Sequence, residues 1–309
     1  MTLDLAVAPG GTRVLTTTAR PMMGGRVSVT ITDDAGSASS ERSADAVLDR
    51  IAAWASRLTR FDTASELSQL NEDVRDEVPV GPTMTAVLDW ARTAEALSDG
   101  LVNIAMLDAR LAAETGAAVR PAASRRWSLR RHARGASVLR CPGLRFDLDG
   151  VAKGWIADRA LAITPGASAL VDGDGDLAVR LAHGDEYLVG VDDPRSGDQM
   201  ALLRLTGGRH GRTLGVATSG TTVHRWLHGG GATHHLIDPL TWRPADTDVI
   251  QATVIAACAR DAEVFAKVAI LAGADRAPAL LDRPGVHGVL LLTTRGEIRA
   301  SSGMLEWLA

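Results

Sequence analysis

Two lysines are the residues whose type and position most strongly suggest chemistry in this chain. Of its 33 basic residues, Lys153 and Lys267 are lysines and the other 31 are arginines. Lysine carries a compact point charge on a flexible stem, whereas arginine presents a planar fork. A site that needs a small cation close to phosphate oxygens would resist exchange to arginine. Chance is the alternative explanation for these two positions.

Lys153 lies in the segment 146–154, FDLDGVAKG, which is typical of an anion site. Apolar and charged residues alternate before it, which predicts a strand over 144–148 that runs into Gly150, and a helical period follows over 151–163. The first N–H groups of such a helix point outward at the positive end of its dipole, so they can hold a phosphate. The alternative is a tight turn with a solvated lysine. The segment lacks the order of a Walker loop.

The turn DGDGD at 172–176 resembles the start of a calcium-binding loop, with carboxylates at alternate positions. However, Leu177 stands where that loop needs glycine, and His183 stands where it needs glutamate. A glycine-rich turn between two strands, with its backbone close to a ligand, is the favoured interpretation.

Four of the eight histidines fall close together, at His224, His228, His234 and His235. Their spacing invites a zinc interpretation, but the H-E-x-x-H pattern is absent, and the glycines at 229–231 predict a hairpin tip that exposes His228. His235 precedes an Asx-Pro turn, where it could act as a general base. The alternative is a core histidine. A Ser219–His235–Asp238 triad is weaker still, because no nucleophile elbow surrounds the serine.

Glu263 and Lys267 stand four residues apart with the acid first, which is the favoured order for an ion pair on a helix. Taken alone, such a pair is usually exposed and contributes little.

Composition limits the class of protein. A length of 309 residues, 46% of them hydrophobic and 23% charged, is typical of a globular protein. The net charge of −4 does not favour binding to nucleic acid or to an anionic membrane. No apolar run is long enough to span a membrane, and the first residues lack the pattern of an export signal. Cys141 and Cys258 need not pair, so we expect a cytoplasmic protein.

The elements that must position these residues are mixed. Long helices interrupt many strands of antiparallel type, which predicts an α+β fold without a clean domain boundary. We expect helices at 43–59, entered through Ser43, at 84–97, at 151–163 and at 262–273, with 109–135 partly helical. We expect strands at 27–31, 144–148, 168–172, 176–181, 186–191, 201–206, 213–218, 249–256, 286–293 and 297–300.

Taken together, these segments resemble the ApbE family of FAD:protein FMN transferases in order and spacing, over roughly residues 20–300. The resemblance is carried by Met22–Gly24, Arg60–Asn71, DLDGVAKGWIAD at 147–158, the turn at 174–176, Val191–Arg195, Thr218–Gly220, His235–Pro239 and the helix from 262 to Gly273. It implies an ApbE-like mixed fold with antiparallel-rich sheets, packed helices and a flavin site in a central cleft. We expect a flexible segment at 1–20 and a single domain at 21–309.

The resemblance also implies the site residues and the reaction. Flavin contacts fall at Met23, Phe61, Leu101, Val102, Asn103, Asp147, Lys153 and Ile237; metal ligands fall at the Gly150 carbonyl, Glu263 and Lys267; and His235 matches the histidine that activates the acceptor. FAD would be the substrate, and its FMN half would pass to a Ser or Thr hydroxyl of an acceptor protein with release of AMP.

The departures from the family pattern concern mainly the metal. Glu263 and Lys267 replace an aspartate and a threonine, and an ammonium cannot ligate Mg²⁺, so Mg²⁺ is doubtful here and Lys267 could replace the ion. Asn103, Ala105 and Trp242 also depart, and a tyrosine expected after Ser219–Gly220 is missing. The alternatives are therefore an FAD-binding carrier, sensor or redox protein without transfer, or an FAD pyrophosphatase.

Overall fold

The structure is a computed structural model that describes residues 2–4, 14–33, 37–119, 124–228 and 231–309. The chain forms two compact units, one of residues 1–52, 153–220 and 248–309, and the other of residues 53–152 and 221–247. We call them the first and the second unit. No helix in the described part of the chain has the length and apolar character needed to cross a membrane.

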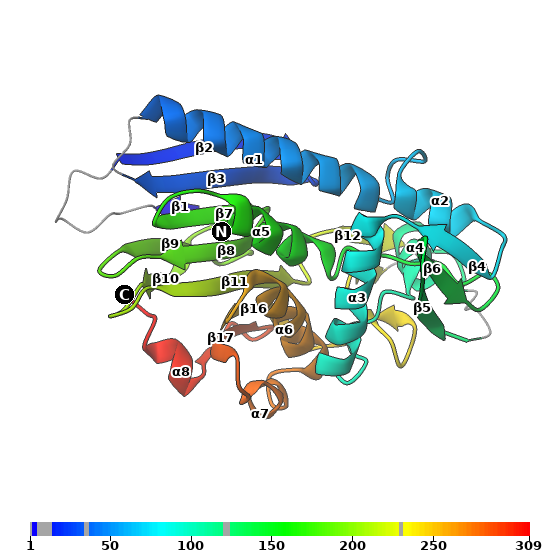
Figure 1. The fold of residues 1–309 in the computed structure, drawn as a ribbon. Coiled ribbons are helices and arrows are strands. Elements are labelled where there is room, and N and C mark those ends of the chain that lie inside the picture. Colours follow the sequence, from blue (N-terminus) through cyan, green and yellow to red (C-terminus); the bar gives the residue numbers. More distant parts are fainter. Residues whose placement is uncertain (1, 5–13, 34–36, 120–123, 229–230) are drawn as a thin grey trace. The chain divides into compact units, whose positions relative to one another are not determined.

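The first unit is built on an antiparallel sheet of eight strands in the order β18-β17-β16-β11-β8-β7-β3-β2 (Figure 1). These strands are β2 (Val14–Met22), β3 (Gly25–Asp33), β7 (Ser168–Gly173), β8 (Asp176–Leu181), β11 (Arg212–Gly220), β16 (Val249–Ala256), β17 (Val286–Thr293) and β18 (Ile298–Ala300). A smaller sheet joins β1 (Thr2–Asp4), β9 (Glu186–Asp192) and β10 (Gln199–Thr206) in the order β1-β9-β10.

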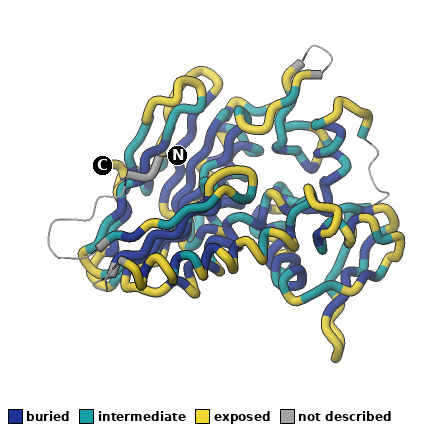
Figure 2. Tube along the Cα trace, turned by 90° about the horizontal axis from the view of Figure 1, so that it is seen from above, coloured by how far each residue is buried: buried dark blue, intermediate teal, exposed yellow. Residues whose placement is uncertain are grey.

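Five helices formed by described residues pack in this unit and contribute buried side chains to its core. They are α1 (Ser37–Leu58), which continues into the second unit, α5 (Ala152–Ile163), α6 (Ala259–Ala272), α7 (Ala277–Leu281) and α8 (Ser302–Leu305). Helix α6 packs against β8, β11 and β16. A buried apolar cluster joins the larger sheet to β9, β10 and the C-terminal Trp307. Figure 2 shows the resulting dark runs of buried residues along the strands.

The second unit is smaller and carries short strands. Its sheet has the order β4-β6-β5, from β4 (Glu77–Val80), β5 (Trp127–His132) and β6 (Gly135–Arg140), and two hairpins pair β12 (Arg225–His228) with β13 (Gly231–His234) and β14 (Ile237–Asp238) with β15 (Arg243–Pro244). Its helices are α2 (Glu66–Glu72), α3 (Pro82–Leu97) and α4 (Leu107–Thr115). The expected tip at 229–231 falls largely on residues outside the described ranges, and the His228 side chain is outside them too.

The predicted α+β class is confirmed, and most elements lie where apolar spacing placed them. Two local predictions were wrong. Helix α1 begins at Ser37, and the Ser43 hydroxyl donates to the Ser39 carbonyl within the helix, so Ser43 does not start it. Residues 144–148 form no strand; instead, the Asn71 side chain accepts from the Phe146 N–H at 2.7 Å and donates to its carbonyl at 2.8 Å. An amide side chain thus satisfies the backbone that a neighbouring strand would otherwise pair.

Part of the segment at 1–20, which we expect to be flexible, is assigned to a strand. Residues 14–20 belong to β2 and pair in register with β3 from Val14 to Met22, while residues 5–13 lie outside the described ranges. The single domain at 21–309 and the central flavin cleft stay predictions.

Candidate functional site

In the first unit, two tight turns meet at a very short distance. Asp174 and Gly175 have φ values of 66° and 93°, and the Gly175 N–H donates to Asp172 Oδ1 at 2.8 Å. Met23, a predicted flavin contact, has φ 60° in the turn between β2 and β3. A Cβ on Gly25 would lie 2.0 Å from Asp174 Oδ1, so a larger residue there would force the Asp174 carboxylate to move.

Lys153 lies beside the carboxylates of the same turn. Its ammonium donates to the Asp174 carbonyl at 3.4 Å and lies 3.9 Å from a carboxylate oxygen of both Asp174 and Asp176. Its side chain is 27% exposed. The solvated lysine that we weighed as an alternative therefore does not describe Lys153, which is held in an acidic environment.

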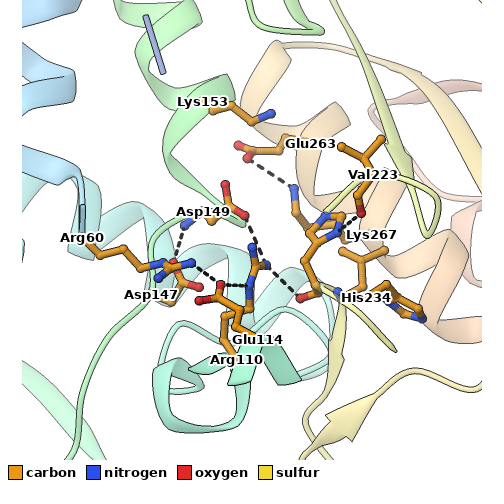
Figure 3. Close-up of polar contacts among 12 residues, drawn as sticks. Arg60, Arg110, Glu114, Asp147, Asp149, Lys153, Val223, His234, Glu263 and Lys267 are labelled. Carbon is orange, nitrogen blue, oxygen red and sulfur yellow. Dashed lines mark hydrogen bonds and ion pairs between the residues drawn. The ribbon is translucent and has the colours of Figure 1, made fainter. Parts of the chain in front are cut away.

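Glu263 is completely buried near the N-terminal end of α6, and its two carboxylate oxygens each accept a hydrogen bond. Its Oε2 accepts from the Gly154 N–H at 3.0 Å. Its Oε1 accepts from the Lys267 ammonium at 3.3 Å (Figure 3). Burial raises the pKa of this carboxyl to about 7, against the opposing effect of the Lys267 charge. The Lys267 side chain is only 12% exposed, so this pair is not the exposed ion pair that its spacing usually indicates.

Helices α5 and α6 approach each other closely enough for this contact because of Gly154. A Cβ at that position would lie 2.7 Å from the Ala259 carbonyl oxygen and from the Arg260 Cα. The Asp158 carboxylate of α5 accepts from the Ala259 and Arg260 N–H groups at 2.9 and 3.1 Å, at the start of α6. Each helix therefore supplies a carboxylate to the N-terminal turn of the other, where the helix dipole favours negative charge.

At the predicted metal position, Glu263 and Lys267 do not offer a divalent ion the open ligands that it needs. Within the described ranges, no group of three or more His, Cys, Asp or Glu side chains could hold one. Both oxygens of Glu263 already accept hydrogen bonds, and the ammonium of Lys267 has no lone pair to offer. Gly150, whose carbonyl was the third predicted ligand, lies in the turn that precedes α5.

In the second unit, a network of charged side chains joins Asp147, Asp149 and the buried Arg110. Asp147 Oδ1 accepts from the Asp149 N–H at 3.1 Å, and the Asp147 N–H donates to the Ile104 carbonyl at 2.8 Å. Desolvation raises the pKa of Asp147, and the Asp149 charge raises it further. Arg110 donates to Glu114 at 2.8 Å and lies 3.5 Å from Asp149, and Glu114 also pairs with Arg60 (Figure 3).

His235 belongs to this network through its backbone and its ring. Its carbonyl accepts from Arg110 at 3.0 Å, and its Nδ1 lies 3.0 Å from the Val223 carbonyl. A carbonyl only accepts, so Nδ1 must carry the proton, and the lone pair of the neutral ring is on Nε2. The ring packs edge-to-face on His224. His234 turns to the Ala245 carbonyl instead, and burial lowers its pKa.

The remaining predicted flavin contacts lie at several places in the second unit. Phe61 is 81% exposed beneath the Arg60 guanidinium, which lies 4.2 Å from its ring centroid. Val102 is buried, whereas Leu101 and Ile237 are half-buried. Asn103 donates to Glu95 at 2.8 Å and accepts from the Ala105 N–H at 2.9 Å. The roles of all these residues toward flavin stay predictions.

Sequence reasoning missed three residues that organise the candidate site residues within each unit. Asn71 ends the segment Arg60–Asn71, but nothing in its spacing indicates Phe146 as its partner. Asp158 followed DLDGVAKG without a sign that it would meet α6. Arg110 lies in an Ala/Arg-rich stretch with weak periodicity, and nothing in the sequence distinguishes it from the other arginines there. No local signal could have identified Arg110.

Comparisons with known proteins agree with this architecture. The FAD:protein FMN transferase of Treponema pallidum is 32% identical over 178 residues, 53% of this chain and 48% of that protein. That of Klebsiella pneumoniae is 27% identical over 173 residues, 55% of this chain and 52% of that protein. The chain thus spans about half the length of the curated relatives it matches.

Solved structures show the same fold over nearly the whole chain. The crystal structure of the ApbE protein from Thermotoga maritima matches with a TM-score of 0.82 at 21% identity, covering 96% of this chain and 100% of that one. The Pseudomonas stutzeri flavinyl transferase ApbE in its apo form matches with a TM-score of 0.76 at 17% identity, covering 98% of each chain. A sequence profile described as the ApbE family matches residues 23–290. Because that match covers most of the sequence, the chain belongs to the ApbE family.

Proposed function

We propose that this protein is an FAD:protein FMN transferase, which binds FAD and transfers its FMN half to a Ser or Thr hydroxyl of an acceptor protein. The observation that carries the proposal is the family match over residues 23–290, since curated relatives bear this name. The geometry of His235 supports the chemistry, because the Nδ1 contact with the Val223 carbonyl puts the lone pair of the neutral ring on Nε2.

The reaction is a phosphoryl transfer. The acceptor oxygen forms a bond to the FMN phosphorus, and the bond from that phosphorus to the bridging oxygen breaks, so AMP leaves with the bridging oxygen. His235 Nε2 takes the hydroxyl proton as the new bond forms. Positioning and charge stabilisation supply most of the rate enhancement in such reactions, because the phosphorus passes through a highly charged arrangement of oxygens.

We propose that the predicted flavin contacts bind FAD, and we assign each of them to its own unit. Met23 and Lys153 belong to the first unit, and Phe61, Asp147 and Ile237 belong to the second. A cytoplasmic location remains part of the proposal and is supported by the free thiols of Cys141 and Cys258.

The test incubates the purified protein with FAD and a panel of candidate acceptor proteins, and measures covalent flavin and AMP in the same samples. Equal amounts of both products are expected. AMP and free FMN without covalent flavin would indicate a pyrophosphatase and overturn the proposal. FAD binding without either product, for every acceptor in the panel, would indicate a carrier or sensor and would overturn it as well.

A further inference from the structure

We propose that the Lys267 ammonium serves as the fixed cation for the FAD pyrophosphate, so that FAD binding needs no divalent metal ion. This inference rests on the proposed function, because it concerns how the same substrate is held. Gly154, Glu263 and Lys267, as well as Lys153 and its acidic neighbours, all belong to the first unit.

The carboxylate that would hold a metal ion is already occupied. Glu263 gives one oxygen to the Gly154 N–H at 3.0 Å and the other to Lys267 at 3.3 Å. A divalent ion bound to Glu263 would have to displace the ammonium, which would leave a second positive charge beside it. Oxygen-rich sites are what a hard cation such as Mg²⁺ prefers, and the described residues form no group of three or more His, Cys, Asp or Glu side chains that could hold one.

Lys267 is held in one place. Its side chain is 12% exposed, and its partner Glu263, one helical turn earlier on α6, is fully buried. An ammonium has three N–H donors, and among the described contacts Lys267 donates one, to Glu263. Two donors therefore remain for oxygen atoms of a ligand, from a charge whose position the buried carboxylate fixes.

Of the two lysines, Lys267 is the better placed to meet an anion. Lys153 lies 3.9 Å from two carboxylates, Asp174 and Asp176, whose joint charge exceeds its own. Lys267 shares a single carboxylate, Glu263, which also interacts with the positive N-terminal end of α5 through Gly154. The charge of Glu263 is thus divided between two positive partners, and more of the Lys267 charge remains for phosphate oxygens.

The first experiment needs no variant. FAD binding to the wild-type protein is measured by calorimetry in EDTA and again with excess Mg²⁺, and the two dissociation constants are expected to agree within about twofold. FAD binding that is lost in EDTA and restored by Mg²⁺ would overturn the inference and leave the proposed function standing. Absence of FAD binding under both conditions would instead overturn the proposed function.

The second experiment assigns the charge to Lys267. Lys267→Met should weaken FAD binding by about 10- to 100-fold, the usual effect of losing a charge-assisted hydrogen bond. Riboflavin has no phosphate, so its affinity should change by less than about twofold. Arg299→Met is the matched control, because it removes one positive charge from the same unit at an exposed ion pair with Asp275. It should change neither affinity.

Because Lys267→Met leaves a buried carboxylate without its ammonium, a second variant guards against misfolding. Lys267→Met combined with Glu263→Gln removes both charges, and it should show the same loss of FAD affinity with riboflavin affinity retained. Lys267→Thr with Glu263→Asp replaces the ion pair by oxygen ligands and should make FAD binding sensitive to EDTA. Unchanged FAD affinity in folded Lys267→Met or in the folded double variant with glutamine would overturn the inference.

Discussion

The guanidinium of Arg110 donates a 3.0 Å hydrogen bond to the backbone carbonyl of His235, across 125 residues of sequence. Arg110 is itself 5% exposed, pairs with Glu114 and lies 5.2 Å from the centroid of the Trp226 ring. One arginine of α4 therefore fixes the main chain of the histidine that we propose as the general base. Arg110 is therefore a positioning residue, which holds the His235 backbone in place and takes no direct part in the reaction.

Substitution of Arg110 tests this relationship. Arg110→Gln should lower kcat for flavin transfer by about 10- to 100-fold, the range expected when a reacting group is misplaced by about 1 Å. KM for FAD should change little. Arg110→Lys should not restore the rate, because a point charge cannot bridge Glu114 and the His235 carbonyl as a planar fork does.

The matched control for Arg110 is Arg131→Gln, which removes an exposed arginine paired with Asp89 in the same unit. It should leave both kinetic constants unchanged. Steady-state kinetics and a thermal melt of each variant decide the matter. If Arg110→Gln reduced only the fraction of folded protein, with normal kcat per folded molecule, Arg110 would be a structural residue alone.

Replacement of His235 should separate catalysis from binding. His235→Ala removes the proposed base, and general-base catalysis contributes about 10²- to 10⁴-fold in rate but little to ground-state affinity. Transfer should fall by that factor while the FAD dissociation constant stays within about twofold. His183→Ala, at an exposed position in the first unit, is the control and should alter neither. A parallel loss of FAD affinity in His235→Ala would make His235 a flavin contact instead.

Asp172 should make the protein less stable as the pH rises. Burial raises the pKa of its carboxyl from 3.8 to about 6; the charges of Asp176 and Asp174 raise it further, and the bond from the Gly175 N–H opposes the shift. The unfolded chain then loses the proton at lower pH than the folded one. Its contribution to stability is therefore full below pH 3.8 and declines as the pH rises to about 6.

A shift of about two pKa units corresponds to roughly 3 kcal/mol at most. The difference in unfolding free energy between wild type and Asp172→Asn should change in that direction between pH 4 and pH 7, as measured by urea denaturation. Asp73→Asn is the control: its pairing with Arg75 lowers the pKa of Asp73 to about 2, below this range. A flat difference for Asp172→Asn would contradict the prediction.

Cys258 should be chemically inert in the folded protein. Burial raises the pKa of its thiol to about 12, and the charges of Asp158 and Asp261 act in the same direction. Because the thiolate is the reactive form, iodoacetamide should modify Cys258 of the folded Cys141→Ala variant at pH 8 at least about 100-fold more slowly than after denaturation. Equal rates in the two states, followed by mass spectrometry, would show that Cys258 is not protected.

The sequence by itself determined the class of fold and most of its elements. Strand β3 was readable because Val27, Val29 and Ile31 alternate with polar residues, and α6 because its apolar residues recur at helical spacing. Such periodicities are local, so they can be recognised without knowing which other segment packs against the element. The order and spacing of the motifs resemble those of the ApbE family. The match of the family profile to residues 23–290 confirms that prediction.

The sequence pattern gave the wrong prediction wherever a residue's environment depends on a segment that is distant in the sequence. Residues 144–148 alternate like a strand, yet Asn71 satisfies the Phe146 backbone in place of a neighbouring strand. Glu263 and Lys267 had the spacing of an exposed pair, but the close approach of α5 at Gly154 buries that pair. No feature of the residue spacing predicted the contact between Arg110 and His235. Burial and long-range hydrogen bonds depend on which segments pack together, so only the tertiary structure decided the environment of each charged group.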